Sequence, residues 1–452
     1  MRLALETAIA RAVGRLSRAA GRGGGTTLPG KLLVRMDPGA LAALSRRLPD
    51  GAALVSATNG KTTTTAMAAE ILAPTRQLAW NRSGANLVSG IASTLLDARG
   101  ARLGLLEVDE AALPVVAREV RPGAIVLGNL FRDQLDRYGE LETVAARWRD
   151  AVDGLPPGAV LVANADDPII AELARDRAGT VFFGLDDPSV GVERLSHAAD
   201  SKYCRACGAP YRYAPAYVGH LGAWRCPTCS SARPPLAVTA RAVALRGLDG
   251  VGFDLHTPVG LARIDLPLPG LYNVYNALAA ASLSLALGAT LAEVEAGLAR
   301  FRPAFGRFER IAAGRGRSAL VLLIKNPAGA NEAIRTIVEG GAPRVAVVAL
   351  NDEIADGRDV SWIWDVDFEP LMPALETLVA TGSRAEELAL RFAYGGFERG
   401  RIEVIGDLAQ ALDRGLELAR PGEELAVLPT YTAMLALRAI ATGRGWVQPF
   451  WA

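Results

Sequence analysis

The sequence contains few cysteines, few histidines and almost no net charge. Its 452 residues include four cysteines and three histidines, and the formal net charge is +1. Four cysteines are too few for a scaffold of this size stapled by disulfides, and three histidines argue against a site that needs several of them together. The charge balance also argues against a protein that coats a polyanion.

Long hydrophobic runs are missing as well. The longest uncharged stretch, 266–292, is interrupted by prolines and asparagines, and its mostly apolar part covers only Ala277–Leu287. A membrane span needs about 20 such residues, so this stretch predicts a buried helix of a soluble domain. Glu6 and Arg11 interrupt the apolar residues at the N-terminus, which argues against a signal peptide and favours a cytoplasmic protein. That segment has the spacing of a basic amphipathic helix, which is expected to pack on the protein itself, with a membrane surface as the alternative.

Apolar runs alternate with helical patterns along most of the chain. Half of the residues are hydrophobic and 21% are charged, which is enough for a large core. Runs typical of buried strands lie at 52–56, 103–108, 124–127 and 160–163, and a second series begins near Ser318. Such alternation predicts α/β domains with parallel, doubly wound sheets.

These patterns divide the chain into three parts. Residues 1–50 are predicted to form a helical arm, 51–305 a central α/β domain, and 306–452 a Rossmann-like α/β domain. A segment at 198–235 is rich in cysteine, tyrosine, proline and glycine, and it predicts a small module inserted in the central domain.

A phosphate-binding loop is predicted where the first strand of the central domain meets a helix. The residues there are Thr58-Asn59-Gly60-Lys61-Thr62. Backbone N–H groups at such a turn attract anions, Gly60 lets the backbone approach a phosphate, and the Lys61 ammonium neutralises it. The Thr62 hydroxyl is a candidate Mg²⁺ ligand. Val55 stands where the usual loop has its first glycine, so this is a variant loop, and a solvated threonine-rich turn is the alternative.

Three carboxylates stand at the end of the predicted strand at 103–108. They belong to Glu107, Asp109 and Glu110. Ligands of parallel sheets bind at the carboxyl ends of the strands, so Glu107 is the predicted carboxylate ligand of Mg²⁺, beside Thr62. A cluster that only caps the next helix is the alternative.

The four cysteines have the spacing of a zinc ribbon. Cys204 and Cys207 form one Cys-x-x-Cys pair, Cys226 and Cys229 form another, and the 18 residues 208–225 separate the pairs. Each pair presents two thiolates to one ion, so together they predict a tetrahedral Zn²⁺ site of the structural kind. Disulfides or free thiols are the alternative.

Several of these motifs resemble the Mur ligase family of ATP-dependent amide-bond-forming enzymes. The family's phosphate loop matches Thr58–Thr63, and its acidic strand end matches Glu107. The segments 129–137 and 164–167 also match, although Gln134 stands where the family often has histidine.

Two further residues match nucleotide contacts of the family. They are Asn276, in the helix start that follows Gly270, and Arg307, in a Gly-Arg turn. The resemblance implies catalytic roles for Lys61 and Glu107. It also implies an ATP site made of Thr58, Asn59, Gly60, Lys61, Thr62, Thr63, Asn276 and Arg307.

Two departures from the family pattern are informative. Only about 50 residues precede the loop, which is too few for a separate UDP-binding domain. The family's Asp-x-x-His-Asn-Pro segment appears only as Leu322-Leu-Ile-Lys325-Asn326-Pro327, so its acidic and histidine contacts do not carry over.

Within the family, three features resemble the MurT-like ligase subunits of lipid II isoglutaminyl synthase: the Cys₄ insert, 326–329 and 356–365. The resemblance implies ATP-dependent amidation of the D-glutamate α-carboxyl of the peptidoglycan stem peptide to D-isoglutamine, through an acyl phosphate. It implies ATP, Mg²⁺ and Zn²⁺ as cofactors, lipid II or a related precursor as substrate, and a GatD-like glutaminase as heterodimer partner, with no nucleic acid. Contact with the inner face of the membrane would then come through the lipid-linked substrate. Asp359 matches the residue thought to orient the partner's catalytic histidine, and a turn cap is the alternative.

The need for a partner also follows from the residues themselves. A class I glutaminase uses a cysteine activated by histidine. All four cysteines here belong to the metal spacing, and no histidine follows His256. Two other functions stay open at this point: a folylpolyglutamate-type amino-acid ligase, and a nucleotide-gated module whose zinc ribbon binds nucleic acid.

Overall fold

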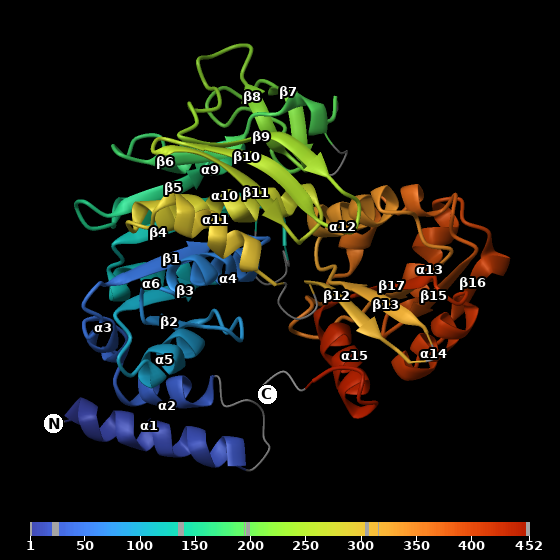
Figure 1. Ribbon diagram of the computed structural model, residues 1–452, viewed down its shortest axis with the longest axis horizontal. Helices are drawn as coiled ribbons and strands as arrows, with labels where there is room; N and C mark the ends of the chain where they lie inside the picture. Colours follow the sequence, from blue (N-terminus) through green and yellow to red (C-terminus); the bar gives the residue numbers. More distant parts are fainter. Residues whose placement is uncertain are drawn as a thin grey trace.

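The structure is a computed structural model in which two α/β lobes lie side by side and an N-terminal helical arm lies against the first lobe (Figure 1). The predicted Gln134, Asp136 and Gly306 lie outside the described residues, as do the side chains of Arg2, Arg18, Ala19 and Arg307. The described residues are 2–19, 27–133, 140–193, 195, 199–302, 307–314 and 316–448.

Among the described residues, the central sheet has nine strands in the order β11-β10-β9-β6-β5-β4-β1-β3-β2. These strands are β1 (Ala52–Ser56), β2 (Leu78–Trp80), β3 (Leu103–Glu107), β4 (Ala124–Leu127), β5 (Val160–Asn164), β6 (Val181–Leu185), β9 (Val238–Leu245), β10 (Val251–Thr257) and β11 (Gly260–Leu266). The seven strands from β2 to β9 are parallel, and the predicted α/β fold is confirmed. The two remaining strands, β10 and β11, are antiparallel because tight turns, which permit only antiparallel pairing, join them to each other and to β9.

Helices cover both faces of this sheet, as a doubly wound fold requires. Alternate residues of β1 enter different cores: Val55 packs with the face covered by α4 and α10, and Leu54 packs with the other face. This explains why the four positions from Ala52 to Val55 are all apolar. The helices are α4 (Lys61–Leu72), α5 (Val88–Asp97), α6 (Leu113–Val120), α8 (Leu141–Asp153), α9 (Pro168–Ala174), α10 (Leu271–Ala286) and α11 (Leu291–Arg300).

Two of these helices begin earlier than their apolar patterns indicate. The apolar run that indicates this helix begins only at Ala66, whereas α4 begins at Lys61, directly after Gly60 in the left-handed conformation (φ 88°). Thr63, Thr64 and Thr65 of its first turns are buried in tertiary contacts, which override their low helix propensity. Similarly, α10 begins at Leu271, directly after Gly270.

The second lobe contains six described strands in the order β12-β13-β17-β14-β15-β16. They are β12 (Arg307–Ala312), β13 (Ser318–Leu322), β14 (Val345–Ala349), β15 (Thr377–Thr381), β16 (Ile402–Val404) and β17 (Glu424–Pro429), with helices α12 (Pro327–Glu339), α13 (Ala385–Tyr394), α14 (Leu408–Leu418) and α15 (Tyr431–Gly443). The apolar run of β13 continues to Ile324, but the strand ends at Leu322. Asn326 then caps α12 by accepting a hydrogen bond from the Gly329 N–H, so Lys325 lies outside the sheet.

The arm consists of α1 (Arg2–Ala19), α2 (Leu28–Met36) and α3 (Ala40–Ser45). Gly30 fits tightly on α5: its N–H donates to Ser93 Oγ at 2.8 Å, and a Cβ there would lie 1.9 Å from the Ser89 carbonyl oxygen. No helix in the described part of the chain has the length and apolar character needed to cross a membrane.

The cysteine-rich insert forms a hairpin of β7 (Arg212–Val218) and β8 (Leu221–Arg225) at the opposite end of the central lobe from the arm (Figure 1). Trp224 anchors it by donating from Nε1 to the Ala165 carbonyl at 2.9 Å. The tip of the hairpin returns to the core, where His220 is completely buried against Phe131.

Candidate functional site

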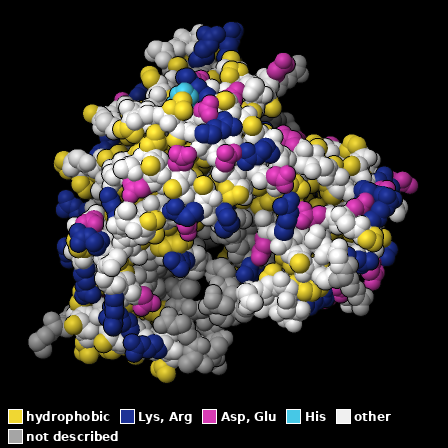
Figure 2. All heavy atoms as spheres, viewed as in Figure 1, with side chains coloured by type: hydrophobic (Ala, Val, Ile, Leu, Met, Phe, Trp, Pro, Cys, Tyr) yellow, Lys and Arg dark blue, Asp and Glu magenta, His cyan; other side chains and the backbone are white. Residues whose placement is uncertain are grey.

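A cavity of about 980 Å³ lies between the two lobes, at the carboxyl ends of β1 and β3. Figure 2 shows the molecule hollowed between the lobes. The parallel pairing sets Val55 of β1 opposite Glu107 of β3, so the predicted phosphate loop and the predicted Mg²⁺ carboxylate emerge at the same edge. The predicted site residues that line the cavity are Thr58, Asn59, Gly60, Lys61, Thr62, Thr63, Glu107 and Asn276.

The phosphate loop is held by its neighbours in a fixed shape. The Asn59 N–H donates to Asn129 Oδ1 at 2.9 Å, and Asn129 Nδ2 donates back to the Asn59 carbonyl at 3.0 Å. Thr58 is fixed through its hydroxyl, which accepts from the Phe131 N–H at 3.0 Å. The Asn129 segment, matched to the Mur ligases by its sequence, thus braces the loop from the next strand.

Gly60 is the point where the loop needs a glycine. Its φ of 88° is unfavourable for other residues, and a Cβ there would lie 2.0 Å from Asn276 Oδ1. Asn276 also accepts from the Thr64 hydroxyl at 3.3 Å. The predicted nucleotide contact from α10 therefore packs directly on the loop, and its side chain is 7% exposed.

Lys61 and Glu110 form a buried ion pair at the start of α4. Lys61 Nζ lies 2.7 Å from Glu110 Oε2, and it also donates to the Ala57 carbonyl at 2.5 Å. Burial raises the pKa of Glu110, and the Lys61 and Lys325 ammonium groups limit that rise. This carboxylate belongs to the cluster that the sequence placed at the strand end, but its partner is the lysine of the loop.

Thr62 and Glu107 face the same point of the cavity. Glu107 is oriented by Asn86, which donates to its Oε1 at 3.1 Å, and its N–H donates to Asn81 Oδ1 at 2.9 Å. A Cβ at Gly84 would lie 3.7 Å from Thr62 Oγ1 and 3.9 Å from Glu107 Oε2, so both oxygens border the same small space. One hydroxyl and one carboxylate beside a phosphate loop form a donor set that fits Mg²⁺.

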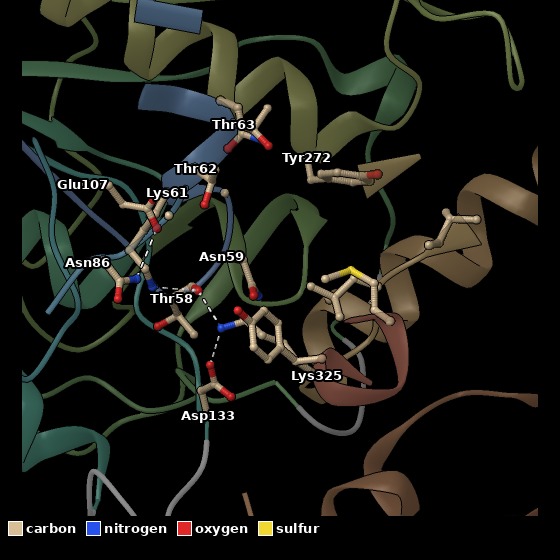
Figure 3. Close-up of a pocket in the computed structure, with 18 of the residues that line it drawn as sticks. Thr58, Asn59, Lys61, Thr62, Thr63, Asn86, Glu107, Asp133, Tyr272 and Lys325 are labelled. Atoms are coloured by element: carbon tan, nitrogen blue, oxygen red, sulfur yellow. Dashed lines mark hydrogen bonds and ion pairs between the residues drawn. The ribbon is translucent and has the colours of Figure 1, made fainter. Parts of the chain in front are cut away.

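The second lobe contributes a cation that the sequence analysis did not assign. Lys325 Nζ lies 2.5 Å from Asp133 Oδ2 and donates to the Thr58 carbonyl at 3.2 Å, and Figure 3 shows both contacts. Lys325 stands where the Mur ligase pattern has histidine, so the sequence indicated only that the histidine contact is missing. Beside it, Asn326 and Asn59 exchange two amide hydrogen bonds, of 3.0 and 3.2 Å.

The far side of the cavity is largely apolar. Tyr272 of α10 lines this side and lies beside the phosphate loop in Figure 3. Val218 and Leu221, at the tip of the cysteine-rich hairpin, line the same wall. The predicted contact of Arg307 lies outside the described side chains.

Asp359 does not line this cavity. It lies on the surface of the second lobe, where its Oδ1 accepts from the Ser361 N–H at 2.8 Å. Hydrogen bonds from the Ser361 hydroxyl and backbone N–H lower the pKa of Asp359, so the exposed carboxylate is charged at neutral pH. The nearby Asp356 is buried and accepts from the Thr432 N–H at 2.8 Å, so the two aspartates of this turn differ in availability.

The four cysteine sulfurs come together, with their Sγ atoms all within 4.8 Å of one another. The Cys204–Cys229 and Cys207–Cys226 Sγ distances are 3.6 and 3.5 Å. Tetrahedral Zn²⁺ with Zn–S bonds of about 2.3 Å sets sulfurs roughly 3.8 Å apart, so the cluster fits the ion. N–H groups of Thr228 and Cys229 point at Cys226 Sγ at 3.4 Å, which favours a thiolate there.

Comparisons with known proteins find relatives over most of the chain. Residues 55–209 match the Mur ligase middle domain, and residues 323–434 match the MurT ligase C-terminal domain. The chain is 34% identical over 439 residues to the lipid II isoglutaminyl synthase (glutamine-hydrolyzing) subunit MurT of Streptococcus pneumoniae, covering 94% of both chains. It is 33% identical over 430 residues to the same subunit of Staphylococcus aureus, again over 94% of both. A solved pseudomurein peptide ligase type C from Methanothermus fervidus has a similar fold, with a TM-score of 0.69 and 20% identity over 89% of this chain and 80% of that one.

Proposed function

The chain belongs to the MurT family of Mur ligases, and from this premise we propose that it amidates the D-glutamate α-carboxyl of the peptidoglycan stem peptide, with lipid II as the acceptor. The observation that carries the proposal is the cavity between the lobes, where a phosphate loop, a carboxylate–hydroxyl pair and a second lysine face one another. We assign residues 51–305 to the ATP-binding domain, 306–452 to the C-terminal MurT-type domain and 1–50 to the arm.

The reaction needs an activated carboxyl group, because a carboxylate does not accept ammonia directly. A carboxylate oxygen attacks the γ-phosphorus of ATP, the bond to the bridging oxygen breaks, and ADP leaves with an acyl phosphate formed. Ammonia then attacks the acyl carbon, phosphate departs with the C–O electron pair, and the nitrogen loses a proton to give the amide. Both steps depend on positioning and on neutralising phosphate charge.

The residues of the cavity meet these needs in separate ways. Backbone N–H groups around Gly60 and the start of α4 cradle the phosphates, and Lys61 and Lys325 supply positive charge from the two lobes. Thr62 and Glu107 would hold Mg²⁺, which neutralises phosphate oxygens when bound. The apolar wall near Tyr272 suits the nucleobase.

The nitrogen must come from a second polypeptide. All four cysteines of the chain lie in the metal cluster, so none is left to serve as a glutaminase nucleophile. We propose a glutaminase partner of the GatD type, with Asp359 orienting the partner's catalytic histidine. The exposed, charged state of Asp359 supports this role. Ala355, in the same surface segment, lines the cavity, which supports delivery of ammonia from this side.

The test is an amidation assay with the chain alone, MgATP, ammonium chloride and lipid II, followed by ADP release and by mass analysis of the product. We expect amidated lipid II to appear in proportion to ADP, and Lys61→Met to abolish both. Consumption of an added amino acid instead of ammonium would identify an amino-acid ligase, and ATP that stays intact with every acceptor would refute the proposal.

A further inference from the structure

The arm carries an apolar ridge on its outward face. Leu5, Ile9 and Leu16 of α1 are 65%, 42% and 68% exposed. They follow one another at helical spacing, with Ala12 between them, so they form one stripe along the helix. These side chains do not help to hold α1 on the protein, because a different face of the helix packs against it.

The inward face holds α1 firmly on the protein. Ala10 is completely buried, Glu6 is 8% exposed, and a Cβ on Gly14 would lie 2.8 Å from Pro29 of α2. Arg11 fastens the middle of the helix by donating from Nη2 to the Leu96 carbonyl at 2.6 Å. The ridge therefore belongs to a rigid surface.

Positive charge gathers beside the ridge. Burial and the like charges of Arg99, Arg47 and Arg15 lower the pKa of Arg11, and the Asp97 carboxylate acts in the opposite sense. Arg15, Arg47 and Arg99 are exposed. Figure 2 shows Lys and Arg side chains next to hydrophobic ones over the α1 end of the molecule, with few acidic groups among them.

The arm also reaches the border of the cavity. Thr27, directly before α2, lines the cavity, and so do residues 82–87, which lead into α5. Helix α2 packs along α5, and α1 packs on both. Helix α1 is therefore connected, through α2 and α5, to the segment 82–87 that borders the cavity.

We propose that α1 docks on the surface of an anionic lipid bilayer, with Leu5, Ile9 and Leu16 entering the interface and the arginines meeting lipid phosphates. An interfacial helix has this pattern of an apolar strip with a basic border. A second copy of the chain fits less well, because pairing this face with itself would bring like charges together. The reason for docking rests on the proposed function, since a lipid-linked acceptor lies in that bilayer, but the binding itself needs no turnover.

The test is sedimentation of the full-length chain with vesicles of phosphatidylglycerol and phosphatidylcholine, compared with vesicles of phosphatidylcholine alone. We expect binding to the anionic vesicles that weakens with salt, and a loss of roughly ten-fold or more in Leu5→Gln/Leu16→Gln and in Arg15→Glu. The matched control is Val259→Gln, which changes a residue that is 68% exposed in the turn between β10 and β11. Melting temperatures should stay unchanged in all variants because the side chains are exposed.

Several outcomes would overturn the inference. They are equal binding to both vesicle types, equal loss in the Val259 control, or a ridge variant that changes the oligomeric mass instead of vesicle binding. Amidation separates this inference from the proposed function. The ridge variants should keep their rate on a soluble acceptor peptide with ammonium and lose rate only on lipid II in vesicles, whereas vesicle binding without amidation of any acceptor would refute the proposed function alone.

Discussion

Replacing Lys325 by methionine separates two roles that this side chain combines. In the structure it neutralises Asp133 at 2.5 Å and presents an ammonium beside the phosphate loop. The Asp133 side chain is 5% exposed and that of Lys325 is 28% exposed. Breaking a fully buried pair costs about 3–5 kcal/mol, and exposed pairs contribute about 0–1 kcal/mol, so this half-buried pair should cost about 1–3 kcal/mol. A loss of about 2 kcal/mol lowers Tm by roughly 4–8 °C in a domain of 150–250 residues.

The double variant Lys325→Met/Asp133→Asn removes the unpaired charge and should recover most of that stability. Amidation with ammonium should stay low, about 100-fold or more below the wild type, in both the single and the double variant, because the phosphate still lacks its second cation. Lys31→Met is the matched control, since Lys31 is exposed on α2. The assays are thermal unfolding and ADP release with lipid II and ammonium. If Asp133→Asn restores the rate together with the stability, Lys325 serves only as the partner of Asp133 and the reasoning is refuted.

Four other changes test separate parts of the structure. Asp359→Asn should abolish glutamine-dependent amidation by the complex and leave ammonium-dependent amidation within a few-fold of the wild type, and loss of both or of neither would contradict its role. Gly60→Ala should weaken ATP binding by more than ten-fold and lower the free energy of unfolding by about 1–2 kcal/mol because of the left-handed backbone. Adding Asn276→Ala to this variant should remove the clash with the amide but leave the backbone strain. Because the pKa of Glu110 is raised by folding, its contribution to stability is complete below its unfolded pKa and declines as the pH rises. The free energy of unfolding of Glu110→Gln, measured with urea, should therefore rise relative to that of the wild type as the pH increases from 4.5. A fall of this difference with pH would disprove the assignment. Removing metal from the Cys₄ cluster should raise the KM for ATP more than it lowers kcat, because the attached hairpin lines the cavity, and Zn²⁺ should reverse the change.

The phosphate loop and the strand that precedes it were predictable because they are local. A run of buried apolar residues followed by Gly-Lys-Thr specifies a strand, a turn and a helix within a few residues. The position of Glu107 followed from the same logic, since parallel strands end at one edge. The clustering of the four cysteine sulfurs was likewise predictable from the cysteine spacing alone, without the fold.

The contribution of Lys325 was not predictable in this way. Its contact with Thr58 joins residues 267 positions apart and depends on how the two lobes meet. The tight start of α4 was concealed for another reason, because threonines are weak helix formers and only burial makes them helical. The antiparallel extension of the central sheet depends on tight turns near 248 and 258, and the pattern of apolar runs alone does not reveal these turns.

The paired amides of Asn59 and Asn326 couple nucleotide binding to the association of the two lobes. They fasten the phosphate loop to the first turn of α12, so the lobes cannot separate without disturbing the loop. Thermodynamic reciprocity then requires that whatever grips the loop also resists separation of the lobes, by the same factor. Splitting the chain near 303–306 should therefore yield two fragments whose affinity for each other increases when nucleotide binds. ATP would then stabilise the association of the lobes as well as drive the reaction.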